Sequence, residues 1–72
     1  MKDGYEKQAK ALEDLVVELE KAVAHAKTAA QHFRVGEVPR GCAHTLAVEG
    51  HVRSAEELLS EIAKRHSLAS KT

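Results

Sequence analysis

The sequence predicts an all-α protein whose chain folds as an antiparallel helical hairpin. Alanine, leucine, glutamate and lysine are abundant, which is the composition of long helices. Apolar residues recur at seven-residue intervals over stretches that contain no proline, the spacing of an amphipathic helix. One interruption, with glycine at position 36 and proline at position 39, separates two such stretches. We therefore expect residues 1–72 to form a single helical-hairpin domain.

The first helix is expected over about residues 3–35, where the only glycine is Gly4. Its apolar side chains form one broad stripe of three rows with seven-residue spacing: Tyr5, Leu12, Leu19, Ala26 and Phe33; Ala9, Val16, Val23 and Ala30; and Leu15, Ala22 and Ala29. Charged residues such as Glu6, Lys10 and Glu13 occupy the opposite face. This pattern predicts a helix that buries its stripe against protein.

The second helix is expected over about residues 39–68, after a turn at residues 36–38. Gly36 can adopt the left-handed conformation that ends a helix. Pro39 suits the first turn of a helix, because its missing N–H group would have no partner there. In the later half, Leu58, Leu59 and Ile62 lie toward one face. A short connection between two long helices makes them antiparallel neighbours.

The breadth of the stripe predicts self-association. Two helices of about thirty residues, each about 45 Å long, touch along one seam and leave part of the stripe uncovered. A homodimeric four-helix bundle, or a higher oligomer, is the simplest closed arrangement. Near the turn the second helix is apolar or small on nearly every side, which predicts a subunit contact there. The residues expected in that contact are Cys42, Leu46, Ala47 and Gly50.

The composition argues against several functional classes. Eleven basic and eleven acidic residues are interspersed, and the aromatic residues are one Tyr and one Phe, so nucleic acid is not an expected partner. There is no apolar run of membrane-spanning length, and the single cysteine is typical of a reducing compartment, so we expect a cytoplasmic protein with no membrane partner. Cys42 and His44 are two positions apart on one helix and point in different directions, so no catalytic dyad and no enzyme activity are expected.

Four of the five histidines are regularly spaced. His25 and His32 are seven apart in the first helix, and His44 and His51 are seven apart in the second. In a hairpin folded about residue 38, positions i and 76 − i lie level, so His32 is expected beside His44 and His25 beside His51. On a helical wheel, His44 and His51 fall within an apolar stripe. His25 and His32 fall at the edge of theirs, facing either solvent or a second subunit.

These pairs allow two interpretations. In the first, the histidines pack or hydrogen-bond at helix interfaces. In the second, they bind a transition metal, since two neutral imidazoles at each level suit zinc, nickel, copper or iron. Haem is a weaker alternative, because few aromatic residues could line its pocket. The candidate ligands are His25, His32, His44 and His51, with Glu18, Glu49, Cys42 or a symmetry-related chain completing the coordination.

One ion cannot bind both histidines of one helix, because seven residues separate them by about 10.5 Å along the axis. The function that the sequence favours is a non-enzymatic module for oligomerisation or protein–protein interaction. Its expected partner is the chain itself or another protein, in a pathway that the sequence does not indicate. Transition-metal binding by the histidines near the turn is the alternative.

Overall fold

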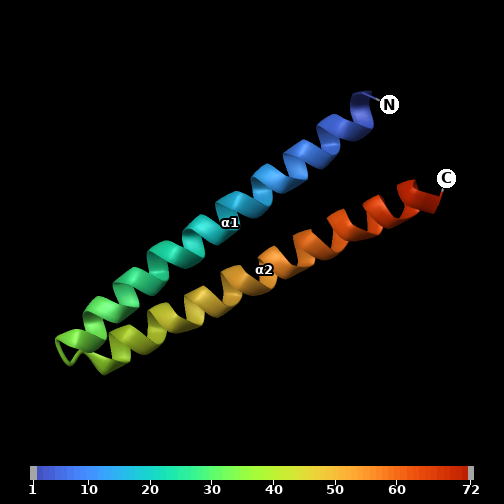
Figure 1. Cartoon of the computed structure of the whole chain (residues 1–72). Helices are drawn as coiled ribbons and strands as arrows, with labels where there is room; N and C mark the ends of the chain where they lie inside the picture. The colour runs from blue at the N-terminus through green and yellow to red at the C-terminus, as the bar shows by residue number, and fades with distance from the viewer. Residues whose placement is uncertain (1, 72) are drawn as a thin grey trace.

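Two long α-helices packed side by side make up the molecule (Figure 1). A computed structural model describes the backbone of residues 2–71 and the side chains of residues 4–64. Helix α1 spans Lys2–Arg34 and helix α2 spans Val38–Lys71, so the first helix ends one residue earlier than expected and the second extends three residues further. The predicted all-α hairpin is confirmed. Neither helix, over the residues searched, has an apolar segment long enough to cross a membrane.

The turn between the helices is closed by a pattern of backbone hydrogen bonds that requires glycine. The Gly36 N–H donates to the Phe33 carbonyl at 3.1 Å, and the Glu37 N–H donates to the His32 carbonyl at 2.8 Å. These two bonds define a Schellman motif, in which the residue after the helix is left-handed. Gly36 has a φ of +80°, as the motif demands. The sequence-based prediction for Gly36 is confirmed.

Two Gly→Ala substitutions should therefore act in opposite directions. Gly36→Ala should destabilise the hairpin by about 1 kcal/mol, because an L-residue with a Cβ is strained at positive φ. Gly50→Ala should stabilise it by up to about 1 kcal/mol, because Gly50 lies in α2 and a Cβ there would meet nothing within 4 Å. Chemical denaturation followed by circular dichroism measures both. Equal effects of the two substitutions would contradict this account of the turn.

Side chains at seven-residue spacing form the seam between α1 and α2. Each helix contributes two rows whose members are all buried or half-buried: Gln8, Leu15, Ala22 and Ala29 with Ala11, Glu18, His25 and His32 on α1, and Gly41, Val48, Ala55 and Ile62 with His44, His51 and Leu58 on α2. A seven-residue repeat keeps two helices in contact along their length. The four histidines therefore belong to the seam itself.

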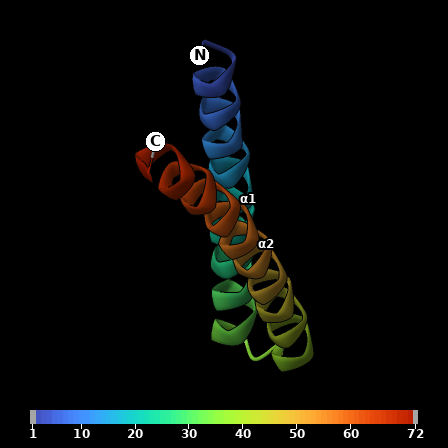
Figure 2. The ribbon, with the colours of Figure 1, turned by 90° about the vertical axis from the view of Figure 1, so that its right-hand side faces the viewer.

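The size of the seam residues determines how closely the helices approach. Ala22, Ala29 and Gly41 lie toward the turn, and the Phe33 ring covers Gly41 so closely that a Cβ there would be 2.7 Å from the ring. The larger Leu58 and Ile62 lie toward the chain ends. The helices accordingly run close together beside the turn and diverge toward the termini (Figure 1), and in the perpendicular view they cross each other (Figure 2). Small side chains permit close helix packing and large ones prevent it.

The seam uses only one edge of the apolar stripe that the sequence shows on α1. Ala22 and Ala29 are buried, at 6% and 5% exposure, whereas Leu12, Leu19 and Val23 in the middle of the stripe stay 44–52% exposed. Burial of the whole stripe is thus not achieved within one chain. The buried apolar residues of the described part are few and mostly small: Ala22, Ala29, Ala55 and Ile62.

Candidate functional site

The most distinctive feature of the seam is a continuous row of polar side chains, which we call the histidine ladder. Its members come alternately from α1 and from α2 or the turn residue just before α2, and they touch one another in sequence: Glu37, His32, His44, His25, His51 and Glu18. Hydrogen bonds and ring stacks alternate along it. All four imidazoles are half-buried, so the contacts are partly protected from water.

A hydrogen bond between two imidazoles lies at the centre of the ladder. The Nδ1 atoms of His25 and His44 are 3.0 Å apart, and the ring centroids are 5.3 Å apart. The centroid separation equals the nitrogen–nitrogen distance plus the radius of each ring, so the two nitrogens point directly at each other. This is the geometry of an N–H···N hydrogen bond, in which one ring donates and the other accepts.

Each central histidine stacks on an outer one. His25 stacks on His51 with centroids 5.3 Å apart and planes 16° apart, and His44 stacks on His32 at 5.4 Å and 15°. These distances fall in the range of offset aromatic stacking. Each pair joins residues of different helices, so the stacks contribute to holding the hairpin in register.

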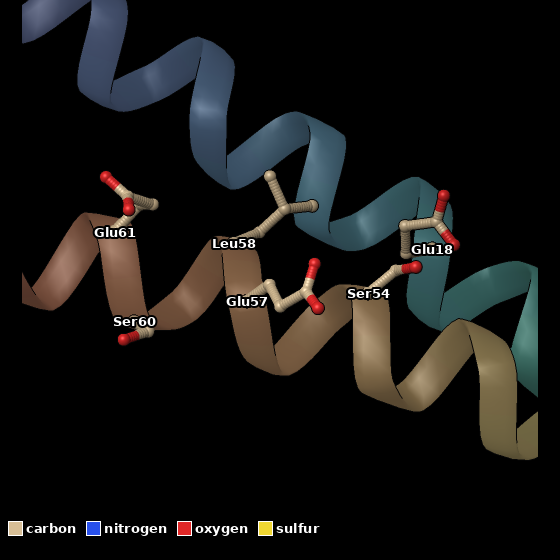
Figure 3. Close-up of a pocket in the computed structure, with 6 residues that line it drawn as sticks. All are labelled: Glu18, Ser54, Glu57, Leu58, Ser60 and Glu61. Atoms are coloured by element: carbon tan, nitrogen blue, oxygen red, sulfur yellow. The ribbon is translucent and has the colours of Figure 1, made fainter.

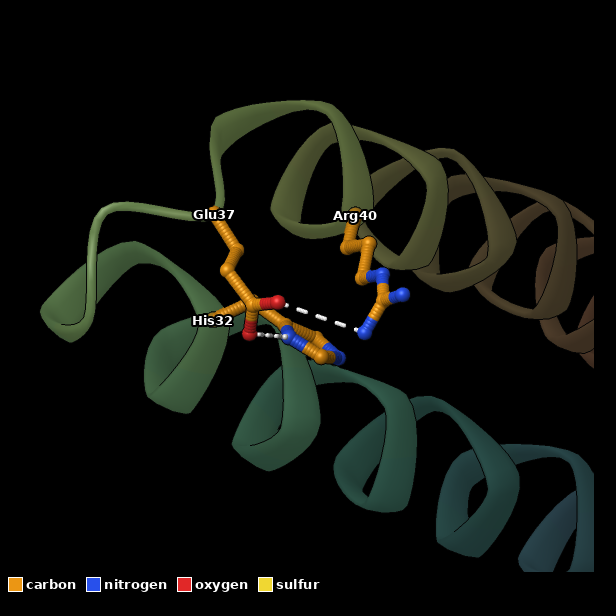
Figure 4. A network of polar contacts seen from close by, with 3 residues as sticks. All are labelled: His32, Glu37 and Arg40. Carbon is orange, nitrogen blue, oxygen red and sulfur yellow. Dashed lines mark hydrogen bonds and ion pairs between the residues drawn. The ribbon is translucent and has the colours of Figure 1, made fainter.

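A carboxylate closes each end of the ladder. His32 Nδ1 lies 3.0 Å from Glu37 Oε1, and Arg40 donates to the other oxygen of Glu37 at 3.2 Å (Figure 4). Glu37 immediately precedes α2, where a negative charge interacts favourably with the helix dipole. At the other end, His51 Nδ1 lies 2.8 Å from Glu18 Oε2. The Glu18 and His51 side chains are 23% and 27% exposed, so water only partly weakens this contact.

The two halves of the ladder are related by an internal repeat. Adding 19 to Glu18, His25 and His32 gives Glu37, His44 and His51. The cation beside each carboxylate obeys the same relation, since Lys21, 4.0 Å from Glu18, corresponds to Arg40. A pseudo-two-fold axis through the central hydrogen bond, normal to the plane of the helices, therefore relates α1 to α2.

The expected histidine pairs are confirmed: His32 lies beside His44, and His25 beside His51. His25 and His32 were expected to face either solvent or a second subunit; both rings are half-buried and contact the other helix of the same chain. The pairing of Glu18 and Glu37 with the outer histidines of the ladder was not predicted from the sequence. The signal was in the sequence, because Glu18 precedes His25, and Glu37 precedes His44, by the same seven residues that separate the histidines.

The described geometry does not favour metal coordination by these histidines. Stacked rings present their faces to each other, whereas a metal ion lies in the plane of each imidazole that binds it. The Nδ1 atoms of His25 and His44 do converge, but at 3.0 Å they leave no room for two metal–nitrogen bonds of about 2.0–2.1 Å unless the rings separate. Within the part of the chain that the structure describes, no three His, Cys, Asp or Glu side chains converge as a metal site. We identify none of the histidines as a metal ligand.

Metal addition should consequently leave the thermal stability unchanged. Equimolar zinc, nickel or copper, or a chelator, should not alter the melting temperature of protein prepared without a histidine tag. A ligand at a hundred times its dissociation constant would add about 2.7 kcal/mol, which for so small a domain is a shift of roughly 10 °C or more. A shift of that size with one metal, lost in His25→Leu/His44→Leu, would restore the metal interpretation.

A hollow next to the ladder is open rather than enclosed. It is lined by Glu18, Ser54, Glu57, Leu58, Ser60 and Glu61 (Figure 3). Leu58 points toward α1, and Glu61 and Glu57 extend from α2 on either side of it (Figure 3). Binding sites for small molecules are usually concave and mostly apolar, with a few converging polar groups. This hollow is open to solvent, and three of its six lining residues are glutamates, so it does not enclose a small molecule in that way.

Large apolar side chains gather on the opposite side of the seam. His25 lies three residues after the buried Ala22, and Leu19 lies three residues before it. On a helix these two steps turn by about 60° in opposite directions, so His25 and Leu19 flank Ala22 on opposite sides. The pseudo-two-fold axis is normal to the plane of the helices, so it leaves each face of the hairpin on its own side. Val38, the counterpart of Leu19, and Val52, the counterpart of Phe33, therefore lie on the same side as Leu19 and Phe33. We call this surface the apolar face; its members are 38–52% exposed: Leu12, Val16, Leu19, Val23, Phe33, Val38, Val52 and Leu59.

The residues expected in a subunit contact fall partly on this face. Cys42 is exposed and is the counterpart of Val23 under the internal repeat, so it adjoins the apolar face. Leu46 and Gly50 are also exposed but lie about 40° and 80° further round α2. Ala47 is half-buried beside the ladder.

The chain matches no family model, and it shows no significant similarity to the curated proteins or to the solved structures.

Proposed function

We propose that this chain is a self-association module, in which two hairpins pair through their apolar faces to form a four-helix bundle. The observation that carries the proposal is the distribution of apolar side chains. Among the described residues, eight of the twelve exposed large apolar side chains lie on the apolar face, while the seam within the hairpin buries mainly alanine. Contiguous apolar surface of this kind marks a protein–protein contact.

The stability of a single hairpin provides a second argument. A fully buried Val or Leu side chain contributes about 1.5–3 kcal/mol, but of the four apolar residues that are buried among residues 4–64 only Ile62 is larger than alanine. Domains of this length usually need a disulfide, a metal or a partner subunit. The single Cys42 excludes a disulfide within the chain. Pairing of hairpins would supply the missing apolar burial.

A second copy of the chain is the occupant that the dimensions and the charge favour. The hairpin extends 55 Å by 17 Å, so one face has a projected area on the order of 900 Å², close to the roughly 800 Å² that each partner buries in a standard interface. The net charge is zero, so two copies approach without general repulsion. A two-fold axis between copies would place Leu19 and Val23 of each chain against the same face of the other.

Of the residues expected in the contact, Cys42 would lie at the edge of this interface, with Leu46 beside it. Ala47 and Gly50 would lie outside it. In this arrangement the histidine ladders would stay on the outer faces of the bundle, because they flank the buried alanine row on the side away from the apolar face.

The test is the mass of the protein in solution. Light scattering coupled to size-exclusion chromatography, under reducing conditions at micromolar concentration, should give about 16 kDa, twice the 7.8 kDa of one chain. Sedimentation equilibrium should show the dimer dissociating on dilution. A folded species of 7.8 kDa across the same concentrations would refute self-association and leave another protein as the partner of the apolar face.

A further inference from the structure

The hydrogen bonds of the histidine ladder define where its protons lie. A carboxylate only accepts hydrogen bonds, so His32 and His51 must each carry a proton on the Nδ1 that faces Glu37 or Glu18. Each of these outer rings can take a second proton on Nε2 without losing a contact. The contact then becomes a charge-assisted hydrogen bond, which is stronger.

The central pair behaves differently. A single proton lies between the Nδ1 atoms of His25 and His44, 3.0 Å apart. The donor ring can become an imidazolium and keep the bond. When the acceptor ring is also protonated at Nδ1, the lone pair that accepted the bond is gone, and two N–H groups and two positive charges face each other.

The stacks connect the central pair to the ends. Once His51 is charged, the ring of His25 lies 5.3 Å from a positive charge, and His44 stands in the same relation to His32. Glu18 and Glu37 can balance the charge of the two outer rings. Of the other charges beside the ladder, Lys21 and Arg40 are positive and mostly exposed, so they balance no further proton. The carboxylates of Glu57 and Glu61, which line the hollow next to Glu18, belong to exposed residues of α2, so water screens their charge.

We propose that the histidine ladder is a pH-sensitive lock on the hairpin, which accommodates two added protons at its ends and opens when protons reach its centre. Histidine titrates near pH 6.5, so the change falls in the weakly acidic range. The lock is built within one chain and does not depend on the proposed self-association.

The direction of the pH effect follows from proton linkage. Protonation of an outer ring at Nε2 leaves its contact with the carboxylate in place, so the ends of the ladder remain closed at either charge. Protonation of both central rings, by contrast, removes the hydrogen bond between them and places two positive charges against each other in the folded chain alone, so the stability contributed by this contact is lost as that protonation proceeds. Stability should therefore be highest near neutral pH and decrease below about pH 6.

Thermal melts of the full chain between about pH 7.5 and about pH 5 test the lock, since the carboxylates remain largely ionised over that range. The wild-type melting temperature should fall by roughly 10 °C below pH 6. In His25→Leu/His44→Leu most of this fall should disappear, because the variant lacks the central pair of histidines. The variant should still fold, since Leu58 shows that the same row of α2 accepts a leucine. Glu18→Gln/Glu37→Gln should move the fall to higher pH, because the outer rings lose the charges that balance them.

The control is Glu49→Gln, which removes a carboxylate that pairs with Arg53 and does not touch the ladder; its pH profile should match that of the wild type. Each profile is measured at two protein concentrations, which separates an effect on association from an effect on the hairpin. Nitrogen NMR of the rings should show one Nδ1 proton shared by His25 and His44 at neutral pH. A wild-type pH profile identical to that of the leucine variant would overturn the proposal, as would a glutamine variant with an unshifted profile.

Discussion

The variant Leu19→Lys/Val23→Glu should be a single chain at concentrations where the wild type is a dimer. The two positions are four apart, so the new side chains can pair with each other along α1, and the net charge stays at zero. A buried Leu or Val contributes about 1.5–3 kcal/mol, and each position occurs twice in a two-fold interface, so the loss is roughly 6 kcal/mol or more. That corresponds to an increase in the dissociation constant of about ten-thousand-fold.

The matched control is Glu57→Lys/Lys64→Glu, which also preserves the net charge and changes two exposed residues of α2 away from the apolar face. This variant should keep the wild-type mass in sedimentation equilibrium. Dissociation of both variants would show that the apolar face is not the contact surface. An unchanged dimer in Leu19→Lys/Val23→Glu would place the interface elsewhere.

Ala29→Leu should destabilise the hairpin by about 2–3 kcal/mol, the cost of overfilling a tightly packed seam. Ala29 is 5% exposed and lies in the half of the seam where α1 and α2 approach most closely. A leucine there would push the helices apart next to His25 and His32 and so weaken the ladder contacts of both rings. For a domain of this length the melting temperature should fall by roughly 10 °C or more.

Ala26→Leu is the corresponding control, since it adds the same atoms to the same helix three residues earlier. Ala26 is exposed in the hairpin and shares a row with Leu19 and Phe33 of the apolar face. The substitution should leave the hairpin intact, and at high protein concentration it should raise the apparent stability if that face is covered by a second copy. Equal destabilisation by the two leucines would contradict the assignment of the seam.

Local features of the chain were sufficient to predict the hairpin. The turn follows from Gly36 and Pro39, because only these residues suit a left-handed helix end and a helix start within so short a segment. The level pairs of histidines follow from numbering alone, since an antiparallel hairpin relates positions that are equidistant from its turn. Both predictions depend on backbone geometry that is the same in every helix.

The contacts within the ladder could not be obtained in this way. His25 both stacks on His51 and hydrogen-bonds to His44. Both contacts depend on the axial offset between the helices, which all the seam residues determine together. A helical wheel weighs each side chain by hydrophobicity, and for α1 it points toward Leu19 and Val23. Only the tertiary structure shows that this hydrophobic direction is not the direction of packing.

The sequence by itself therefore determined two helices, their turn and the pairing of residues across it. The tertiary structure decided which edge of α1 meets α2, and the physical reason is close approach. Helices come nearest where side chains are smallest, so the seam formed along Ala22 and Ala29 opposite Gly41, drawing in the neighbouring histidines and leaving the large apolar side chains on the outside.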